Sequence, residues 1–158
     1  MLAKTHDQVR RIYDQIGVVK RLSDRIIGIG PINLIGLDGI LAWIPGAGPA
    51  YSVLAGAFIL TQGVRARCDP VTLISAFIVL AIDSGVSLFD NPIIPIPSII
   101  DTFFQGHLYA AHMIQKDIDK THYVEGMASE AYRTGAHETH MATMRSLKGK
   151  KRIVYLAG

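Results

Sequence analysis

Residues 36–49 read Gly-Leu-Asp-Gly-Ile-Leu-Ala-Trp-Ile-Pro-Gly-Ala-Gly-Pro, so a single acid, Asp38, stands inside an apolar run that ends in prolines and glycines. The same order returns once, with Asp83 in a second apolar run and Pro95 and Pro97 after it. Proline lacks a backbone N–H and glycine is flexible, so both interrupt helices. The repeat therefore predicts two helix–break–helix hairpins. Their breaks are expected at Pro45, Gly46, Gly48, Pro49, Pro95 and Pro97.

The composition around this repeat indicates a lipid bilayer. Hydrophobic residues make up 49% of the 158 residues and charged residues 18%, where about 25% charged is typical of soluble domains. Residues 71–115 contain no Lys or Arg at all. We therefore expect an all-α membrane protein in which residues 27–116 form the two hairpins. A first-hairpin arm of about 14 residues is about 21 Å long, short of a ~30 Å hydrocarbon core, so transmembrane and re-entrant hairpins both stay open.

The basic residues predict the location and the orientation. All 16 Lys and Arg fall in residues 1–25, at positions 65 and 67, or in residues 116–158. Positive residues favour the cytoplasmic side of a membrane. We expect a protein of the bacterial inner (cytoplasmic) membrane with both termini in the cytoplasm, membrane lipids as partners and no nucleic acid. The single cysteine, Cys68, excludes a disulfide within the chain and fits a reducing compartment.

The two ends of the chain have different compositions from the middle. Residues 1–26 read as an amphipathic surface helix that begins with a capping box at Thr5 and Gln8. Packing on a protein surface is the alternative for this helix. Residues 117–158 read as a soluble cytoplasmic tail with short helices at 127–133 and 138–147 and an apolar end that suits surface attachment or strand addition to a partner. Candidates for lipid headgroups are Arg10, Arg11, Lys20, Arg21, Arg25, Lys148, Lys150, Lys151 and Arg152.

Acids inside the apolar runs are the main candidates for a functional site, because burying a charge in a membrane is costly. One interpretation is proton or cation handling by the carboxylates. The other is structural, with each carboxylate accepting the backbone N–H groups that a helix break frees. The intramembrane polar candidates are Asp38, Asp83, Asp101, Gln105 and His112.

The sequence carries no pattern that favours catalysis. It has no Gly-x-Ser-x-Gly elbow and no phosphate-binding glycine loop. His137 and His140 are three residues apart, which is not the four-residue spacing of the His-Glu-x-x-His zinc motif. We expect no enzyme activity, no metal and no cofactor.

The chain resembles a family of small bacterial membrane proteins that is known only as a domain of unknown function. The resemblance covers roughly residues 25–115 and lies in Gly-Leu-Asp at 36–38, Ile-Pro-Gly-x-Gly at 44–48, and a second half that matches at Asp83, Ile96, Pro97, Asp101 and Phe103. The chain departs from the family at Pro49 and Phe104, where the family has Asp, and at Ile100, where it has Gly. The resemblance implies location and architecture, and no activity.

Two functions follow as expectations. The first is a non-enzymatic integral membrane accessory or assembly subunit of a larger complex, for example a respiratory or photosynthetic one, because short, broken and polar-striped arms need other subunits to cover them. The alternative is a small homo-oligomeric ion or proton channel or carrier that uses the intramembrane aspartates.

Overall fold

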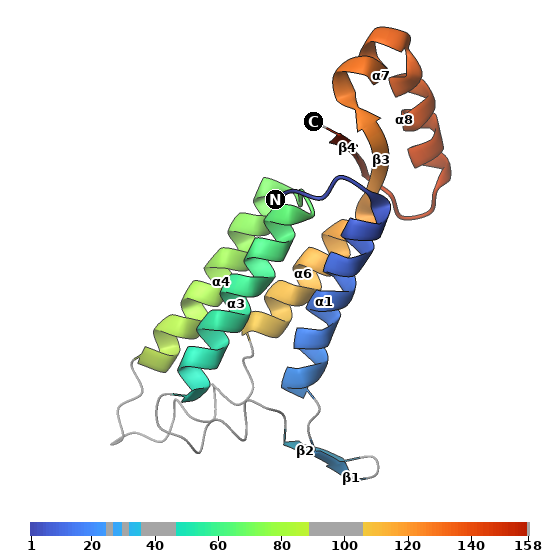
Figure 1. Ribbon diagram of the computed structural model, residues 1–158. Helices are drawn as coiled ribbons and strands as arrows, with labels where there is room; N and C mark the ends of the chain where they lie inside the picture. The colour runs from blue at the N-terminus through green and yellow to red at the C-terminus, as the bar shows by residue number, and fades with distance from the viewer. Residues whose placement is uncertain (25–26, 30–31, 36–46, 89–105, 158) are drawn as a thin grey trace.

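A computed structural model describes residues 1–24, 27–29, 32–35, 47–88 and 106–157 of the chain. Four helices pack side by side, namely α1 (His6–Asp24), α3 (Ala47–Arg65), α4 (Pro70–Leu88) and α6 (Gly106–Lys120). A unit of two short helices and two strands stands on one end of these helices, and a small hairpin lies at the other end (Figure 1).

The N-terminal helix α1 forms as the sequence predicts, but its apolar side is turned inward. The Thr5 side chain accepts the backbone N–H of Gln8 at 3.3 Å, and the Gln8 side chain accepts the Lys4 N–H at 2.7 Å. Ile12 and Ile16 are fully buried, since apolar residues spaced by four lie on one face of a helix. This face packs against α3 and α6, so the protein's own bundle covers it instead of a lipid surface.

A short loop, residues 66–69, joins α3 to α4. α3 ends in a Schellman motif, with Cys68 N–H donating to Gly63 O and Arg67 N–H donating to Val64 O, both at 3.0 Å. Arg67 takes the left-handed position with a φ of 55°, which is usually occupied by glycine. As predicted from the Asp69-Pro70 pair, α4 begins at Pro70, and the Asp69 carboxylate accepts the N–H of Val71 at 3.1 Å.

The core of the bundle lies where α1, α3 and α6 meet. Ile59 of α3 and Ile114 of α6 are fully buried together with the α1 isoleucines. Gly63 lets α6 approach α3 closely, because a Cβ at this position would come within 2.8 Å of the Ile114 Cδ1 atom. Leu156, near the end of the chain, closes the same core.

Strands appear in two places that the sequence interpretation assigned to helices or to a tail. β1 (Ile27–Ile29) and β2 (Ile32–Ile35) form an antiparallel pair, and β3 (Thr121–Met127) and β4 (Arg152–Ala157) form a parallel pair. Between β3 and β4 lie α7 (Ala128–Thr134) and α8 (Ala136–Ser146), close to the two short helices that were predicted. Gly135, at a φ of 77°, ends α7 and begins α8.

The expected all-α membrane fold is wrong. Across the described ranges no helix has both the length and the apolar character needed to cross a membrane. The described residues also form strands, β1, β2, β3 and β4, besides the helices. The predicted soluble tail is instead a folded unit, because β4 returns to pair with β3 directly after α6. The first helical arm, predicted over 32–45, begins with strand β2, and residues 36–46 lie outside the described part of the chain.

Candidate functional site

The outer side of α3 and α4 carries an apolar face that the rest of the described chain leaves uncovered. Val71, Ile74, Ile78 and Ile82 recur every three or four residues, so they line one side of α4. Leu54 of α3 is 70% exposed. Single exposed apolar residues are common, whereas a continuous group marks an interaction site. We call this group the apolar face; it comprises Val53, Leu54, Phe58, Val64, Val71, Ile74, Phe77, Ile78 and Ile82.

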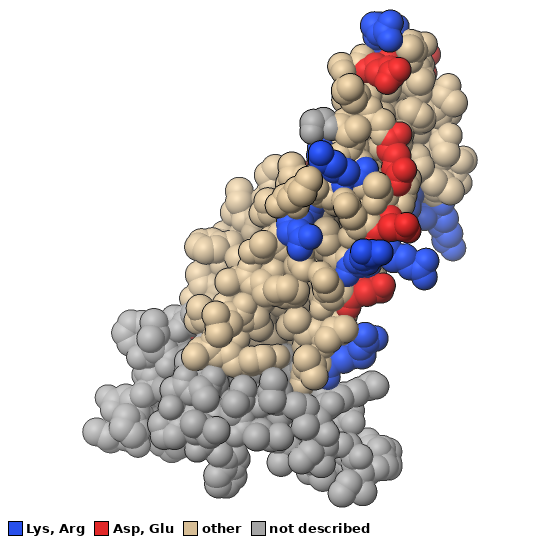
Figure 2. Space-filling view, in the orientation of Figure 1, with Lys and Arg blue, Asp and Glu red and all other residues tan. Residues whose placement is uncertain are grey.

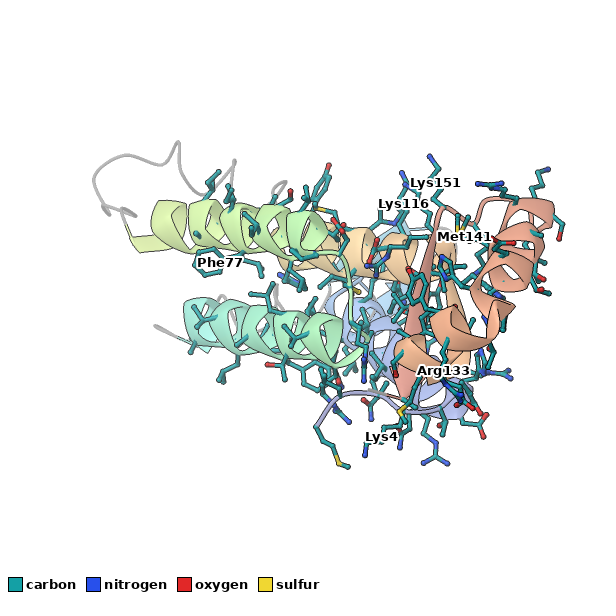
Figure 3. The ribbon with its side chains drawn as sticks, turned by 90° about the horizontal axis from the view of Figure 1, so that it is seen from above. Lys4, Phe77, Lys116, Arg133, Met141 and Lys151 are labelled. Carbon is teal, nitrogen blue, oxygen red and sulfur yellow. The ribbon has the colours of Figure 1, made fainter. Side chains whose placement is uncertain are left out.

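A groove runs along the apolar face between the two helices. Small residues, Gly56, Ala57 and Ala81, leave space in it, and Phe77 forms part of its wall. Figure 3 shows the Phe77 side chain lying on the side of α4 that faces α3. Gly56 allows the close approach of the helices, because a Cβ there would lie 2.8 Å from the Leu80 Cδ2 atom. A groove floored by small residues is the surface on which another helix packs closely.

Charged residues are few on the two helices that carry the apolar face. α3 has no Lys, Arg, Asp or Glu before Arg65, and α4 has only Asp83. Figure 2 shows the same division, with red and blue atoms gathered over α1 and the C-terminal unit and tan atoms over α3 and α4. In Figure 3, Lys4, Lys116 and Lys151 lie at the end away from Phe77. The surface of α3 and α4 is therefore mostly apolar, whereas the surface of α1 and the C-terminal unit carries charge.

Asp83 is buried near the end of α4 and holds the start of α6. It is 6% exposed, and its Oδ1 atom accepts the backbone N–H of Gly106, the first residue of α6, at 3.1 Å. A carboxylate is stabilised at a helix N-terminus by the free N–H groups and the helix dipole. A Cβ at position 106 would lie 2.5 Å from the Asp83 Cβ atom, so this contact requires glycine.

Two further polar rings lie at the same end of the bundle. His107, which follows Gly106, is 1% exposed, and its ring meets the ring of Tyr51 edge-on with centroids 6.1 Å apart. These residues surround the start of α6 with polar groups from α3, α4 and α6.

The opposite end of the bundle is tied to the C-terminal unit by a network centred on Asp117. The Asp117 Oδ2 atom accepts from the Arg152 guanidinium and from the Asp69 N–H, both at 2.9 Å. Arg152 also donates to Arg67 O at 2.8 Å, and the Arg67 guanidinium donates to two carbonyls of β4. The Tyr123 hydroxyl donates to Ala66 O at 2.8 Å. The α3–α4 loop is thus clamped between α6, β3 and β4.

Burial governs the ionisation of the groups inside this network. Burial, reinforced by the negative charge of Asp117, raises the pKa of the Cys68 thiol to about 12. Burial is also the main reason why the pKa of Tyr123 is raised. Cys68 is therefore a protonated, inert core residue at neutral pH. At the surface, a hydrogen bond from the His6 backbone N–H lowers the pKa of Glu125 and ties the start of α1 to β3.

Several predicted site residues lie outside the described part of the chain. They are Asp38, Asp101, Gln105, Arg25, Pro45, Gly46, Pro95 and Pro97. Gly48 and Pro49, two of the predicted break residues, belong to the first turn of α3, where a proline is tolerated. His112 is exposed on α6, away from the buried end of α4 that holds Asp83.

The predicted headgroup residues divide into free and engaged side chains. Arg10, Arg11 and Arg21 are exposed along α1, Lys20 is half-buried there, and Lys148 and Lys151 are exposed before β4. Arg152 is corrected, because its guanidinium is engaged within the protein by Asp117, Arg67 and Thr121. Lys150 likewise donates to Thr121 O at 2.8 Å.

One cluster contains two histidines that the sequence interpretation considered as metal ligands and set aside. The Nδ1 atoms of His137 and His140 each lie 3.0 Å from the hydroxyl of Tyr155 in β4. The ring of Tyr132 lies against that of His137 with centroids 4.2 Å apart. The signal was the three-residue spacing of the histidines, which places them on one face of a helix. Among the residues described, no group of three or more His, Cys, Asp or Glu is placed to hold a metal ion.

Comparison with known proteins places the bundle in a family. Residues 12–118, more than half of the chain, match a family described as Domain of unknown function (DUF4112). The chain belongs to this family. The DUF4112 region begins in α1 and ends in α6, so it contains the apolar face and leaves β3, α7, α8 and β4 outside. The expected membership of an uncharacterised family is confirmed. No curated protein and no solved structure matches the chain.

Proposed function

We propose that this protein is a non-enzymatic, membrane-associated accessory subunit whose apolar face packs on a helix of a larger membrane complex. The observation that carries the proposal is the uncovered apolar face, which lies on two helices whose exposed residues carry charge only at Arg65, the last residue of α3. Leaving such a face in water is unfavourable by roughly 25 cal/mol per Å² of apolar surface. A permanent partner removes this cost.

The groove favours a protein helix over lipid tails as the occupant. Its floor of Gly56, Ala57 and Ala81 lets a second backbone approach closely, and close backbone approach is what drives helix association in apolar surroundings. The charged part of the molecule, with α1 and the C-terminal unit, then stays in water on the cytoplasmic side of the cytoplasmic membrane. The distribution of Lys and Arg supports that side.

The alternative of an ion or proton channel has weaker support. Asp83 is engaged at the start of α6. A carboxylate that holds a helix terminus is costly to release for transport, because the N–H groups it satisfies would be left buried.

Native mass determination after extraction in a mild detergent tests the proposal. We expect the chain to run in a complex heavier than its own 17.2 kDa. Ala57→Trp, which fills the groove, should release the chain from that complex, while Ala142→Trp on exposed α8 should leave the complex intact. A wild-type species of the mass of the chain alone, with or without bound lipid, would contradict the proposal.

A second measurement tests the location. Cys68 is unsuitable as a labelling site, because it is buried and its thiol pKa is raised. A cysteine placed at exposed Ser129 in a Cys68→Ala background is the better probe. We expect a membrane-impermeant thiol reagent to label Ser129→Cys in inverted vesicles and not in intact cells. Labelling in intact cells would place the C-terminal unit on the outer side.

A further inference from the structure

The C-terminal unit brings two imidazole nitrogens to one phenol oxygen, and all three are metal-ligand atoms. His137 and His140 project from α8, and Tyr155 belongs to β4, on which α8 packs. Both histidines turn the same ring nitrogen, Nδ1, toward the Tyr155 hydroxyl, and both separations are 3.0 Å.

These separations match those between ligands that share one metal ion. Zn²⁺ binds imidazole nitrogens at about 2.0–2.1 Å, and two neighbouring ligands at this distance are about 2.9 Å apart on a square ion and about 3.3 Å apart on a tetrahedral one. Imidazole suits Zn²⁺ and Cu²⁺ alike, and a phenolate oxygen adds negative charge to the set. The three residues are only partly buried, which leaves room for water at the remaining positions of the ion.

The surroundings hold the histidine rings in this orientation. Tyr132 of α7 lies against the His137 ring with an interplanar angle of 30°. The ring of His140 is 5.7 Å from that of Tyr155. Packing that fixes the ligands before the ion arrives raises affinity, because less side-chain entropy is lost on binding.

We propose that His137, His140 and Tyr155 form a binding site for one divalent transition-metal ion, Zn²⁺ or Cu²⁺, in the unit outside the DUF4112 region. The ion replaces the protons that lie between the three atoms. Each imidazole binds through the Nδ1 lone pair with its proton on Nε2, and the Tyr155 hydroxyl releases its proton to water as its oxygen binds the ion. An ion there joins α8 to β4.

The same contacts also describe a metal-free arrangement, in which the Tyr155 hydroxyl donates to one histidine and accepts from the other. The two arrangements differ in whether the folded protein takes up an ion. Equilibrium dialysis and calorimetry of the full-length chain, purified without a histidine tag, with Zn²⁺ and separately with Cu²⁺, measure this directly. We expect one ion per chain, and a phenolate-to-copper charge-transfer band in the visible spectrum with Cu²⁺.

Variants assign the ligands. His137→Ala and His140→Ala should each weaken binding by at least about tenfold, and Tyr155→Phe should abolish the charge-transfer band while keeping the ring. His112→Ala, at an exposed position on α6, is the control and should bind as the wild type does. Circular dichroism verifies that each variant is folded. Absence of stoichiometric binding to the wild-type chain, or unchanged binding in both histidine variants, would overturn the proposal.

Discussion

Replacing Arg152 with methionine tests whether the network at Asp117 holds the C-terminal unit on the bundle. Methionine keeps much of the length of the apolar stem and removes the guanidinium. The change deletes hydrogen bonds of 2.9 Å to Asp117, 2.8 Å to Arg67 O and 2.9 Å to the Thr121 hydroxyl. Asp117 is 11% exposed and Arg152 26% exposed, so water replaces these bonds only in part.

The expected cost is about 3 kcal/mol in the free energy of unfolding. Removing one partner of a buried ion pair costs roughly 3–5 kcal/mol, because the other charge is left behind. The cost of Arg152→Met should lie at the lower end of this range, since the Asp69 N–H still donates to Asp117 at 2.9 Å. In a chain of this size each kcal/mol lowers the melting temperature by about 2–4 °C, so we expect a drop of about 6–12 °C.

Thermal melts of the purified protein, followed by circular dichroism, measure the drop. Arg145→Met on exposed α8 is the matched control, with an expected change below about 0.5 kcal/mol. Asp117→Asn combined with Arg152→Met should cost less than the sum of the two single changes by about 1–2 kcal/mol, because the residues are in contact. A melting temperature for Arg152→Met within about 2 °C of wild type, or strict additivity in the double variant, would refute the reasoning.

Three further predictions concern the core and the helix cap. Gly106→Ala should destabilise the protein by about 1–3 kcal/mol, because the added Cβ would lie 2.5 Å from the Asp83 Cβ atom. A melting temperature equal to that of the wild type would instead show that α4 and α6 can separate at no cost. Ile114→Ala should lower the free energy of unfolding by about 2–5 kcal/mol, whereas Ile74→Ala on the apolar face should leave that of the isolated chain nearly unchanged. Equal losses of stability in the two variants would argue against an uncovered face. Because the folded state raises the pKa of Cys68 from 9.0 to about 12, its contribution to stability is complete below about pH 9 and is lost as the pH rises toward 12. The melting temperature of Cys68→Ala should therefore fall less than that of the wild type between those pH values. Equal falls in the two proteins would contradict the raised pKa of Cys68.

Local patterns in the sequence determined the local structure. Thr5 and Gln8 predicted the start of α1, and Asp69-Pro70 predicted the start of α4, because helix capping acts over two to four residues. The short helices α7 and α8 were also expected, in the part of the chain that Gly126, Gly135 and Gly149 punctuate. The separation of charge along the chain also appeared in the sequence, and it became the division between the apolar face and the charged part of the molecule.

Tertiary structure decided which distant residues meet. Asp83 faces Gly106, 23 residues later, and Arg152 faces Asp117, 35 residues earlier. No spacing rule covers such pairs, since they depend on how whole helices and strands pack. The parallel pairing of β3 with β4 turned a predicted tail into a folded unit. It also brought Tyr155 to His137 and His140, whose spacing alone had not indicated a shared ligand. The tertiary structure also decided which side chains are buried, because burial depends on which faces of each helix or strand the other elements cover.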